Sequence, residues 1–337
     1  MIRHLVTSRN NTTYRRFRAS LIAACLTGAA CCSAIGEMAA ADKPIHTWFH
    51  CHGEQSFADL EGHTNMVASV SMFGAPTAAL VKQIREAGVE TYRLVSGPAE
   101  NIVPPLRERT IKGYLQDCQQ LGFDGIDLDY ESLPKSNRKA YTEFIRDLAG
   151  KLRAANKKLS ICVAYTPQMQ GAAPDPGFYD TKAIAAHCDL VRVMCYDKHL
   201  ASKPGHGPTS TAPWAGEAAR FWLRYVPRKK LVIGLPAYSN DYDLRPGERG
   251  RQVPRDRPEV SNDTKVERTW RPFEHIHVYR YLDEDGRGRV FYASDARSTA
   301  AHLETVKKLG VAGFGFWHHG SVSAEMWTAI RKSISKP

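Results

Sequence analysis

The sequence predicts a single-domain (β/α)8 barrel, the TIM-barrel class. Eight apolar runs rich in β-branched residues indicate buried strands, and helical patterns lie between most of them. The runs extend from residue 45 to residue 317, and a barrel of this class typically needs about 250 residues. An open, doubly wound sheet is the alternative, but HCHGEQS follows the first run in place of a glycine-rich phosphate loop.

The elements follow in order along the chain. The predicted strands are residues 45–51, 66–73, 89–95, 123–130, 159–165, 190–196, 231–238 and 311–317. Apolar residues at helical spacing lie between them, at Leu80, Ile84 and Ala87, at Ile111, Leu115 and Cys118, at Tyr141, Ile145, Leu148 and Leu152, and at Leu303 and Val306. Three predicted helices end at Gly88, Gly122 or Gly310, which we expect to be left-handed residues at helix-to-strand turns.

The regular spacing breaks once, between the seventh and eighth predicted strands. A polar segment rich in arginine and proline runs from residue 240 to about residue 289. We interpret it as an extended loop on the face where barrel active sites lie, and not as a separate domain.

The first 41 residues have the order of a secretory signal peptide. Five arginines precede an apolar run at residues 21–35, and three alanines follow at 39–41. This order predicts cleavage just before Asp42, a catalytic domain over residues 42–337, and export to the periplasm, the extracellular space or a lysosome-like compartment. The run is shorter than the roughly 20 residues that span a bilayer. A lipoprotein box ending at Cys25 is the alternative.

Charge and cysteine content restrict the classes of partner. Removing residues 1–41 takes away five arginines and one glutamate, which lowers the formal net charge from +11 to +7. This net charge is compatible with binding to an anionic polymer or with simple solubility, and no nucleic-acid motif accompanies it.

An odd number of cysteines remains after the leader, without a C-x-x-C pair, which favours buried unpaired thiols over a zinc site. These cysteines are Cys51, Cys118, Cys162, Cys188 and Cys195.

The segment GFDGIDLDYESLP, residues 122–134, places four acids in an otherwise apolar strand. Because strand side chains alternate, Asp127, Asp129 and Glu131 share one face, about 6.6–7 Å apart, and we expect them inside the barrel. Glu131 comes at the C-terminal end, where barrel catalysis occurs. Like charges in a low dielectric oppose each other's ionisation, so one acid should hold a proton at neutral pH, and the outermost can donate it. Asp124 has the opposite parity and no predicted catalytic role.

Four stretches of the chain resemble the motifs of glycoside hydrolase family 18, the chitinase family. DGIDLDYE (124–131) is similar to its D-G-x-D-x-D-x-E signature. MCYD (194–197), GLPAYS (234–239) and GFGFW (313–317) follow in the family's order. The resemblance is nearest to the compact branch of di-N-acetylchitobiase and the spore-cortex N-acetylglucosaminidases, on GPTSTAPW (207–214) and YSNDYD (238–243). About fifty residues after the seventh strand are too few for the full α+β insertion domain of many chitinases.

The resemblance implies hydrolysis of β-linked N-acetylglucosamine glycans with retention, assisted by the substrate's own acetamido group. Glu131 would be the general acid and base, and Asp129 would hold the acetamide N–H with Asp127 behind it. Tyr196 would bond the acetamide oxygen. The same resemblance assigns Asp197 and Met194 to the sugar site.

Three aromatic residues at strand ends complete the predicted substrate site. Trp317 would form an apolar floor under the sugar, because a flat ring complements the sugar's C–H face. Tyr238 and Tyr165 are candidate sugar contacts. Two departures from the family pattern stand out: Tyr130 replaces a common Trp, and RLVSGP (93–98) lacks a clear S-x-G-G motif.

Two other functional classes stay open at this stage. A glycan-binding lectin could use the same barrel, although such relatives usually lose the acid at the Glu131 position. A metal-dependent hydrolase could use the carboxylates as ligands of Mg²⁺ or Ca²⁺. The main hypothesis needs neither cofactor nor metal, and it expects a monomer that acts on chitooligosaccharide or peptidoglycan, without nucleic acid or a membrane span after signal removal.

Overall fold

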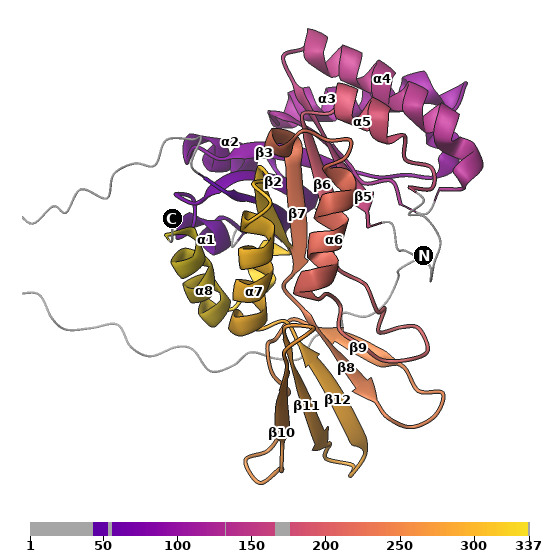
Figure 1. Ribbon diagram of the computed structural model, residues 1–337. Coiled ribbons are helices and arrows are strands. Elements are labelled where there is room, and N and C mark those ends of the chain that lie inside the picture. Colours follow the sequence, from indigo (N-terminus) through magenta and orange to yellow (C-terminus); the bar gives the residue numbers. More distant parts are fainter. Residues whose placement is uncertain (1–42, 53–55, 132, 166–175, 336–337) are drawn as a thin grey trace, which may run out of the picture. The chain divides into compact units, whose positions relative to one another are not determined.

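The computed structural model describes residues 43–52, 56–131, 133–165 and 176–335. The predicted signal peptide, residues 1–41, lies outside this part. Within it, eight parallel strands close a barrel in the order β1-β13-β7-β6-β5-β4-β3-β2, which confirms the predicted fold class (Figure 1). The barrel strands are β1 (Ile45–Cys51), β2 (Val67–Gly74), β3 (Glu90–Val95), β4 (Gly125–Leu128), β5 (Lys158–Ala164), β6 (Leu190–Met194), β7 (Leu231–Pro236) and β13 (Gly313–Trp317).

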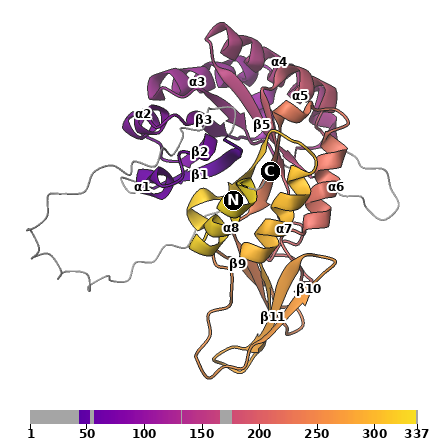
Figure 2. The same ribbon diagram turned by 60° about the vertical axis from the view of Figure 1, so that its left-hand side comes forward.

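Helices cover the outside of the barrel (Figure 2). Those of the described part are α1 (Ser56–Glu61), α2 (Ala78–Glu86), α3 (Leu106–Leu121), α4 (Arg138–Ala154), α5 (Thr181–His187), α6 (Ala212–Trp222), α7 (Ala296–Lys307) and α8 (Ala324–Ile334). Several begin at a side chain that accepts a backbone N–H of the first turn, such as Asp180 before α5 and Asp295 before α7. The three predicted turn glycines have φ values of 74°, 80° and 60° at Gly88, Gly122 and Gly310, as expected of left-handed residues.

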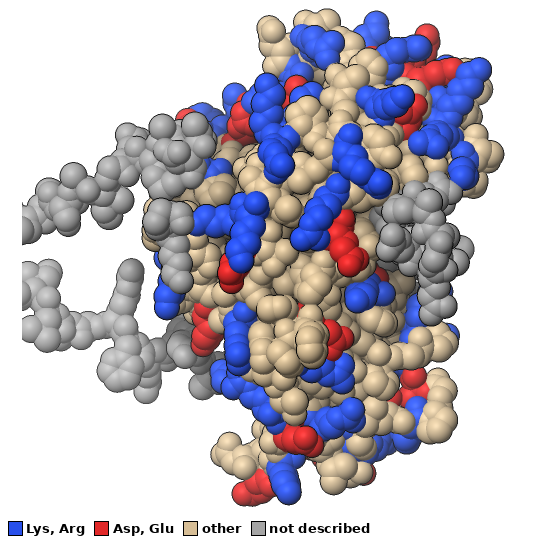
Figure 3. Space-filling model, in the orientation of Figure 1, with Lys and Arg blue, Asp and Glu red and all other residues tan. Residues whose placement is uncertain are grey.

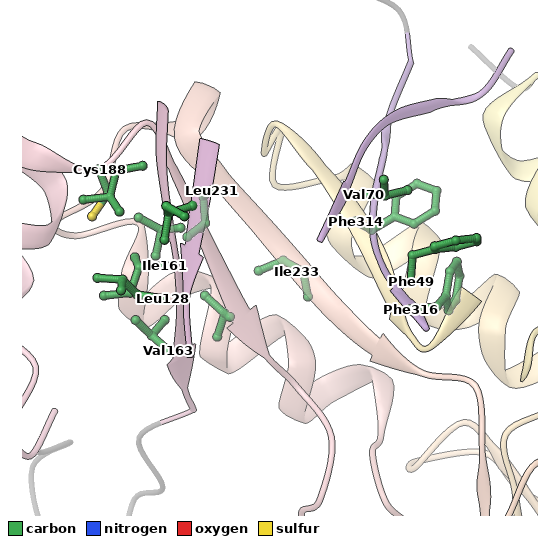
Figure 4. Packing of buried hydrophobic residues seen from close by; sticks show 14 of the residues in the cluster. Phe49, Val70, Leu128, Ile161, Val163, Cys188, Leu231, Ile233, Phe314 and Phe316 are labelled. Atoms are coloured by element: carbon green, nitrogen blue, oxygen red, sulfur yellow. The ribbon is translucent and has the colours of Figure 1, made fainter. Parts of the chain in front are cut away.

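The main core lies between the strands and the helices. Outward-facing strand residues such as Leu128, Ile161 and Val163 are fully buried there. Figure 4 shows these three side chains together on neighbouring strands, and Phe49 beside Phe316 across β1 and β13. Leu128 and Ile161 are register partners in β4 and β5. This packing fixes the strand parity, so that the alternate residues point into the barrel.

The segment after β7 differs from the extended loop that the sequence predicts. Its described residues form an antiparallel five-stranded sheet of order β10-β11-β12-β8-β9. The strands are β8 (Ser239–Asp243), β9 (Gly250–Val253), β10 (Glu267–Arg271), β11 (Ile276–Leu282) and β12 (Gly288–Ala293). Because β8 begins three residues after β7 ends, the sheet lies at the C-terminal end of the barrel strands (Figure 1). Charged and polar residues are mixed with the apolar residues of these strands, so the composition of the segment does not indicate a sheet.

The predicted state of the thiols is confirmed. All five cysteines of the described part are buried and unpaired, and burial raises the pKa of Cys51 to about 12 and that of Cys118 to about 11. Among the described helices, none is long and apolar enough to cross a membrane. Figure 3 shows lysines and arginines spread over one face and interspersed with acids, as expected of a basic, well-solvated surface.

Candidate active site

The acidic row begins in β4 and continues past it. The strand itself ends at Leu128, two residues earlier than predicted. The backbone stays aligned beyond it, because the Asp129 amide donates to the Val95 carbonyl of β3 at 2.8 Å. Asp127 is fully buried inside the barrel, Asp129 is partly buried, and Glu131 is exposed where the row reaches the surface. The burial of the three carboxylates therefore decreases stepwise toward the C-terminal end.

Asp127 is held by three neighbours from three strands. Its Oδ2 accepts hydrogen bonds from Ser71 Oγ at 2.5 Å and Cys162 Sγ at 3.3 Å. Arg192 Nε of β6 lies 3.5 Å from the same oxygen, and both charged side chains are completely buried. The structure thus adds a fixed cation to what the sequence analysis described as a row of acids.

Asp129 is the carboxyl whose proton affinity is raised most clearly. Burial, the charge of Glu131 and the charge of Asp127 together raise its pKa to about 8, against a smaller opposing effect of the Cys162 thiol. Its Oδ1 is buried and has no hydrogen-bond partner among the described residues. This raised pKa favours a proton on Asp129 at neutral pH, whereas the sequence analysis gave the role of proton donor to the outermost acid, Glu131.

Glu131 lines a pocket of about 510 Å³. Loss of water on the pocket side and the charge of Asp197 raise the pKa of Glu131 above its ordinary value. The side chain faces this pocket rather than the outer helices, and Tyr165, Met194, Tyr196 and Asp197 line it too. Five of the predicted site residues are thus brought together around one cavity.

Tyr196 and Asp197 follow β6 and face the pocket. The Tyr196 hydroxyl is buried without a hydrogen-bond partner in the described part of the chain. Asp197 has a positive φ of 60°, and its amide donates to Thr209 Oγ1 at 3.0 Å, which stabilises the turn that exposes its carboxylate. Tyr238 and Gln252 both donate to Asp197 Oδ1, at 2.5 and 2.7 Å. Tyr238 therefore supports Asp197 from behind rather than lining the cavity.

Trp317 ends β13 beside the same site. Its ring is 6.1 Å from that of Tyr196 and stacks on Phe73 of β2 at 4.9 Å, with the two planes only 11° apart. Trp48 of β1 packs edge-on against both Trp317 and Tyr196. These contacts give Trp317 a fixed orientation next to the predicted sugar position.

Asp124, the fourth acid of the segment, is engaged outside the barrel. It accepts from Arg85 Nε at 2.9 Å and from the amide and hydroxyl of Thr91 at 3.0 and 3.1 Å. Its position agrees with the opposite parity read from the sequence, and it holds α2 against β3 and β4.

Sequence reasoning missed several residues that complete the site. Arg192 has the same parity as Met194 and Tyr196, so strand alternation alone could have placed it inside the barrel. Trp214 and Glu217 of α6 also line the pocket, and the ring centroids of Trp214 and Tyr165 are 4.4 Å apart. Gln252 comes from β9 of the inserted sheet, and no sequence signal links it to β6. Among the described residues, no group of three or more His, Cys, Asp or Glu is arranged to hold a metal ion.

The comparisons with known proteins agree with this geometry. Residues 99–321 match the family "Glycosyl hydrolases family 18". The match covers more than half of the chain, and the chain therefore belongs to this family.

The chain is also similar to two proteins of Bacillus subtilis. The chain is 27% identical over 228 residues to the Bacillus subtilis protein YdhD, which covers 64% of this chain and 51% of YdhD. It is 23% identical over 232 residues to the cortical fragment-lytic enzyme of Bacillus subtilis, covering 67% and 53%. The chain thus spans about half the length of these curated relatives.

Among solved structures, a chitinase from Chromobacterium violaceum superposes with a TM-score of 0.75 at 19% identity, covering 87% of this chain and 100% of the other. The spore cortex-lytic enzyme SleL of Bacillus megaterium gives a TM-score of 0.72 at 16% identity, covering 86% and 74%. At such identities, the structural likeness supports the fold alone.

Proposed function

We propose that this protein is a glycosidase that hydrolyses β-linked N-acetylglucosamine glycans with retention, with the substrate's acetamido group as the nucleophile. One observation carries the proposal. Glu131, a titratable acid, and Tyr196 line one pocket, and two buried polar groups lack partners in the described chain: the Tyr196 hydroxyl and Oδ1 of Asp129, whose charge acts on Tyr196. Buried polar groups are normally paired, so unpaired ones beside a pocket suit a polar ligand.

The first step breaks the glycosidic bond. The Glu131 carboxyl donates its proton to the glycosidic oxygen as the bond from that oxygen to C1 breaks. The acetamide carbonyl oxygen attacks C1 at the same time and forms an oxazolinium ion. Burial and the charge of Asp197 raise the pKa of Glu131, which favours the protonated form that this step requires.

Two further residues stabilise the charge that develops on the acetamido group. Tyr196 donates its hydroxyl to the acetamide oxygen, and Asp129 Oδ1 accepts the acetamide N–H. A carboxyl that carries a proton on its other oxygen can still accept this N–H, and the positive charge that develops on the acetamido group strengthens this hydrogen bond. Because these groups are fixed by packing, they stabilise the transition state without reorganisation.

The second step returns the enzyme to its starting state. The Glu131 carboxylate removes a proton from a water molecule, the water oxygen attacks C1, and the oxazolinium ring opens. The new hydroxyl at C1 has the configuration of the original bond. Asp197, held by Tyr238 and Gln252, and Trp317 orient the sugar during both steps.

The test is Glu131→Gln, which keeps the shape of the side chain and removes the acid. We expect cleavage of a chromogenic N-acetylglucosamine oligomer to fall at least about 100-fold, because general acid catalysis contributes that much or more. Binding of the oligomer should survive, as measured by calorimetry. Equal turnover by the variant would refute the role of Glu131.

Two results with the wild-type protein would indicate another function. Binding without turnover would indicate a lectin. Activity that is lost on chelation and restored by Mg²⁺ would indicate a metal-dependent hydrolase.

Substrate class and export belong to the same proposal. Product analysis on chitooligosaccharides beside purified peptidoglycan distinguishes the two candidate polymers and shows whether cleavage is internal or terminal.

Export by the leader predicts a mature chain that begins at Asp42, which intact-mass measurement on the secreted protein would reveal. A mature chain that retains residues 1–41 would contradict export by cleavage.

A further inference from the structure

Arg192 is a fully buried arginine in the middle of the barrel. It lies in β6, two residues before Met194, and shares the inward-facing parity of Met194. Arginine is almost never completely buried unless it is paired. The proposed function assigns no role to this residue, so its position requires a separate explanation.

The guanidinium group is fixed by contacts from several strands. Its Nε donates to Ser160 Oγ of β5 at 3.0 Å, and its Nη2 donates to Ser69 Oγ of β2 at 2.9 Å. The group also lies over the rings of Trp48 and Tyr92, at 5.9 and 5.5 Å from the ring centroids. These contacts leave Nε 3.5 Å from Asp127 Oδ2.

Stability alone does not account for this ion pair. Replacement of a buried ion pair by apolar residues is often neutral or stabilising. In addition, Arg192 Nη1 is buried without a hydrogen-bond partner in the described part of the chain, which costs stability. The alternative is that the positive charge of Arg192 has a function of its own.

Apart from Arg192, the titratable groups around Asp127 do not place a positive charge beside it. His46 of β1 bonds Ser69 through Nδ1, and burial and the charge of Arg192 lower its pKa to about 3, so it is neutral. Burial raises the pKa values of Tyr92 of β3 and Cys162 of β5 well above their ordinary values, so both are neutral as well. Lys158 of β5 is engaged with Glu90 at the exposed end of its strand.

We propose that Arg192 is a positioning residue that holds Asp127 as a carboxylate and thereby assigns the proton of the acidic row to Asp129. Asp127 has no solvent contact, and without a cation beside it, it would take up the proton itself. With Arg192 in place, the negative charge stays at the bottom of the row. That charge is one of the causes that raise the pKa of Asp129.

The catalytic consequence rests on the proposed function. A proton on Asp129 lies next to Glu131 and beside the acetamido group of the substrate, whereas a proton on Asp127 lies below both. Arg192 would thus determine whether the row is correctly protonated for the first step. The location of the proton is a property of the free protein and can be measured without substrate.

The experiment is an NMR titration of the folded protein labelled at aspartate ¹³Cγ. Asp127→Asn and Asp129→Asn identify the two signals by their disappearance. In the wild-type protein we expect the Asp129 signal to titrate near pH 8, and the Asp127 signal to stay that of a carboxylate throughout the neutral range. A neutral-range titration of Asp127 would overturn the proposal, and this result does not depend on any variant of Arg192.

Variants of Arg192 test the cause. In Arg192→Met the order should reverse: Asp127 holds the proton, and Asp129, relieved of a neighbouring charge, titrates about one pH unit or more below its wild-type value. Arg192→Lys keeps the charge and should retain the wild-type order. Arg107→Met is the matched control, because Arg107 pairs with Glu143 between α3 and α4, outside the barrel. Unchanged titrations in Arg192→Met would refute the proposed cause.

Activity and stability supply two further readouts. The alkaline limb of kcat/KM should move to lower pH in Arg192→Met and return in Arg192→Lys. Arg192→Met and Asp127→Asn should each lower the melting temperature, and the double variant should recover part of that loss, because neither side chain is then an unpaired buried charge. Additive losses in the double variant would contradict the pairing. A failure of Glu131→Gln to lose activity would refute the proposed function and leave these titrations unaffected.

Discussion

At the scale of single residues, four acids in one short segment have four different environments. Asp124 is bonded outside the barrel, Asp127 is paired with Arg192, Asp129 lies in a partly buried position among negative charges, and Glu131 faces the pocket. Asp124, Asp127 and Asp129 have the same side chain, so their different surroundings follow from position alone. This difference is what the proposed reaction requires.

The raised pKa of Asp129 predicts a pH dependence of stability. Between pH 3.8 and about 8, Asp129 is protonated in the folded state and ionised in the unfolded state, so the folded state binds more protons. The stability contributed by this group is therefore lost as pH rises through that window, by at most about 1.4 kcal/mol per pH unit. In the Asp129→Asn variant, the side chain at position 129 has no titratable group.

We expect the melting temperature of Asp129→Asn to rise relative to the wild-type protein across this window and then to level off. Calorimetry at a series of pH values measures it. A constant difference between the two proteins over the whole range would show that Asp129 is an ordinary surface-like acid.

Because the hydroxyl of Tyr196 is unpaired, its removal should change activity and stability differently. Tyr196→Phe removes a buried polar atom that has no partner, so the free energy of unfolding should stay constant or rise slightly. Loss of a hydrogen bond to the transition state should lower kcat about 100-fold. Turnover of chitooligosaccharide and chemical denaturation measure the two quantities.

Tyr281→Phe is the matched control in the inserted sheet. Its hydroxyl donates to Asp241 at 3.0 Å, so its removal should cost about 1 kcal/mol of stability and leave turnover intact. If Tyr196→Phe lost stability like the control and kept its activity, Tyr196 would be a structural residue.

At the scale of elements, β13 shows how closely the barrel strands pack. A Cβ atom added at Gly315 would overlap the carbonyl oxygen of His46 in β1. Backbone atoms cannot move aside without opening the barrel where Trp317 is placed. The glycine spacing of GFGFW is therefore a packing requirement at this position as well as part of a family motif.

Gly315→Ala should lower the free energy of unfolding by about 3 kcal/mol, since overpacking against backbone has few ways to relax. Gly150→Ala is the control, because Gly150 is exposed in α4 and an added Cβ meets nothing within 4 Å. Higher helix propensity should raise stability there by about 1 kcal/mol. Urea denaturation measures the free energy of unfolding of both variants. Equal changes in the two variants would refute the close approach of Gly315 to the His46 carbonyl oxygen.

The inserted sheet marks the limit of sequence-based prediction for elements. The barrel strands are continuous apolar runs, buried on both faces, and each could be located from the sequence. Strands such as Glu267–Arg271 are rich in charged and polar residues, and this strand gains its order from pairing with the next strand along the chain, β11. Gln252, which bonds Asp197 from this sheet, was inaccessible for the same reason.

At the scale of the whole molecule, the candidate site joins residues from β4, β6, β7, β13 and the inserted sheet. Strand parity and motif order indicated Asp127, Asp129, Glu131, Tyr196 and Trp317, because those signals are local. The charge that faces Asp127 depends on strand order around the closed barrel, which no local pattern records. The fold was thus predictable as a class and the acids as a row, whereas the individual surroundings of the acids could be found only from the structure.

The most direct test of the central claim is the anomeric configuration of the first product, followed by ¹H NMR during hydrolysis of a chitooligosaccharide. Participation of the acetamido group predicts that the β-anomer appears first and then mutarotates, and that an analogue with a 2-hydroxyl in place of the acetamido group is not cleaved. Initial formation of the α-anomer, or efficient cleavage of the analogue, would contradict the account.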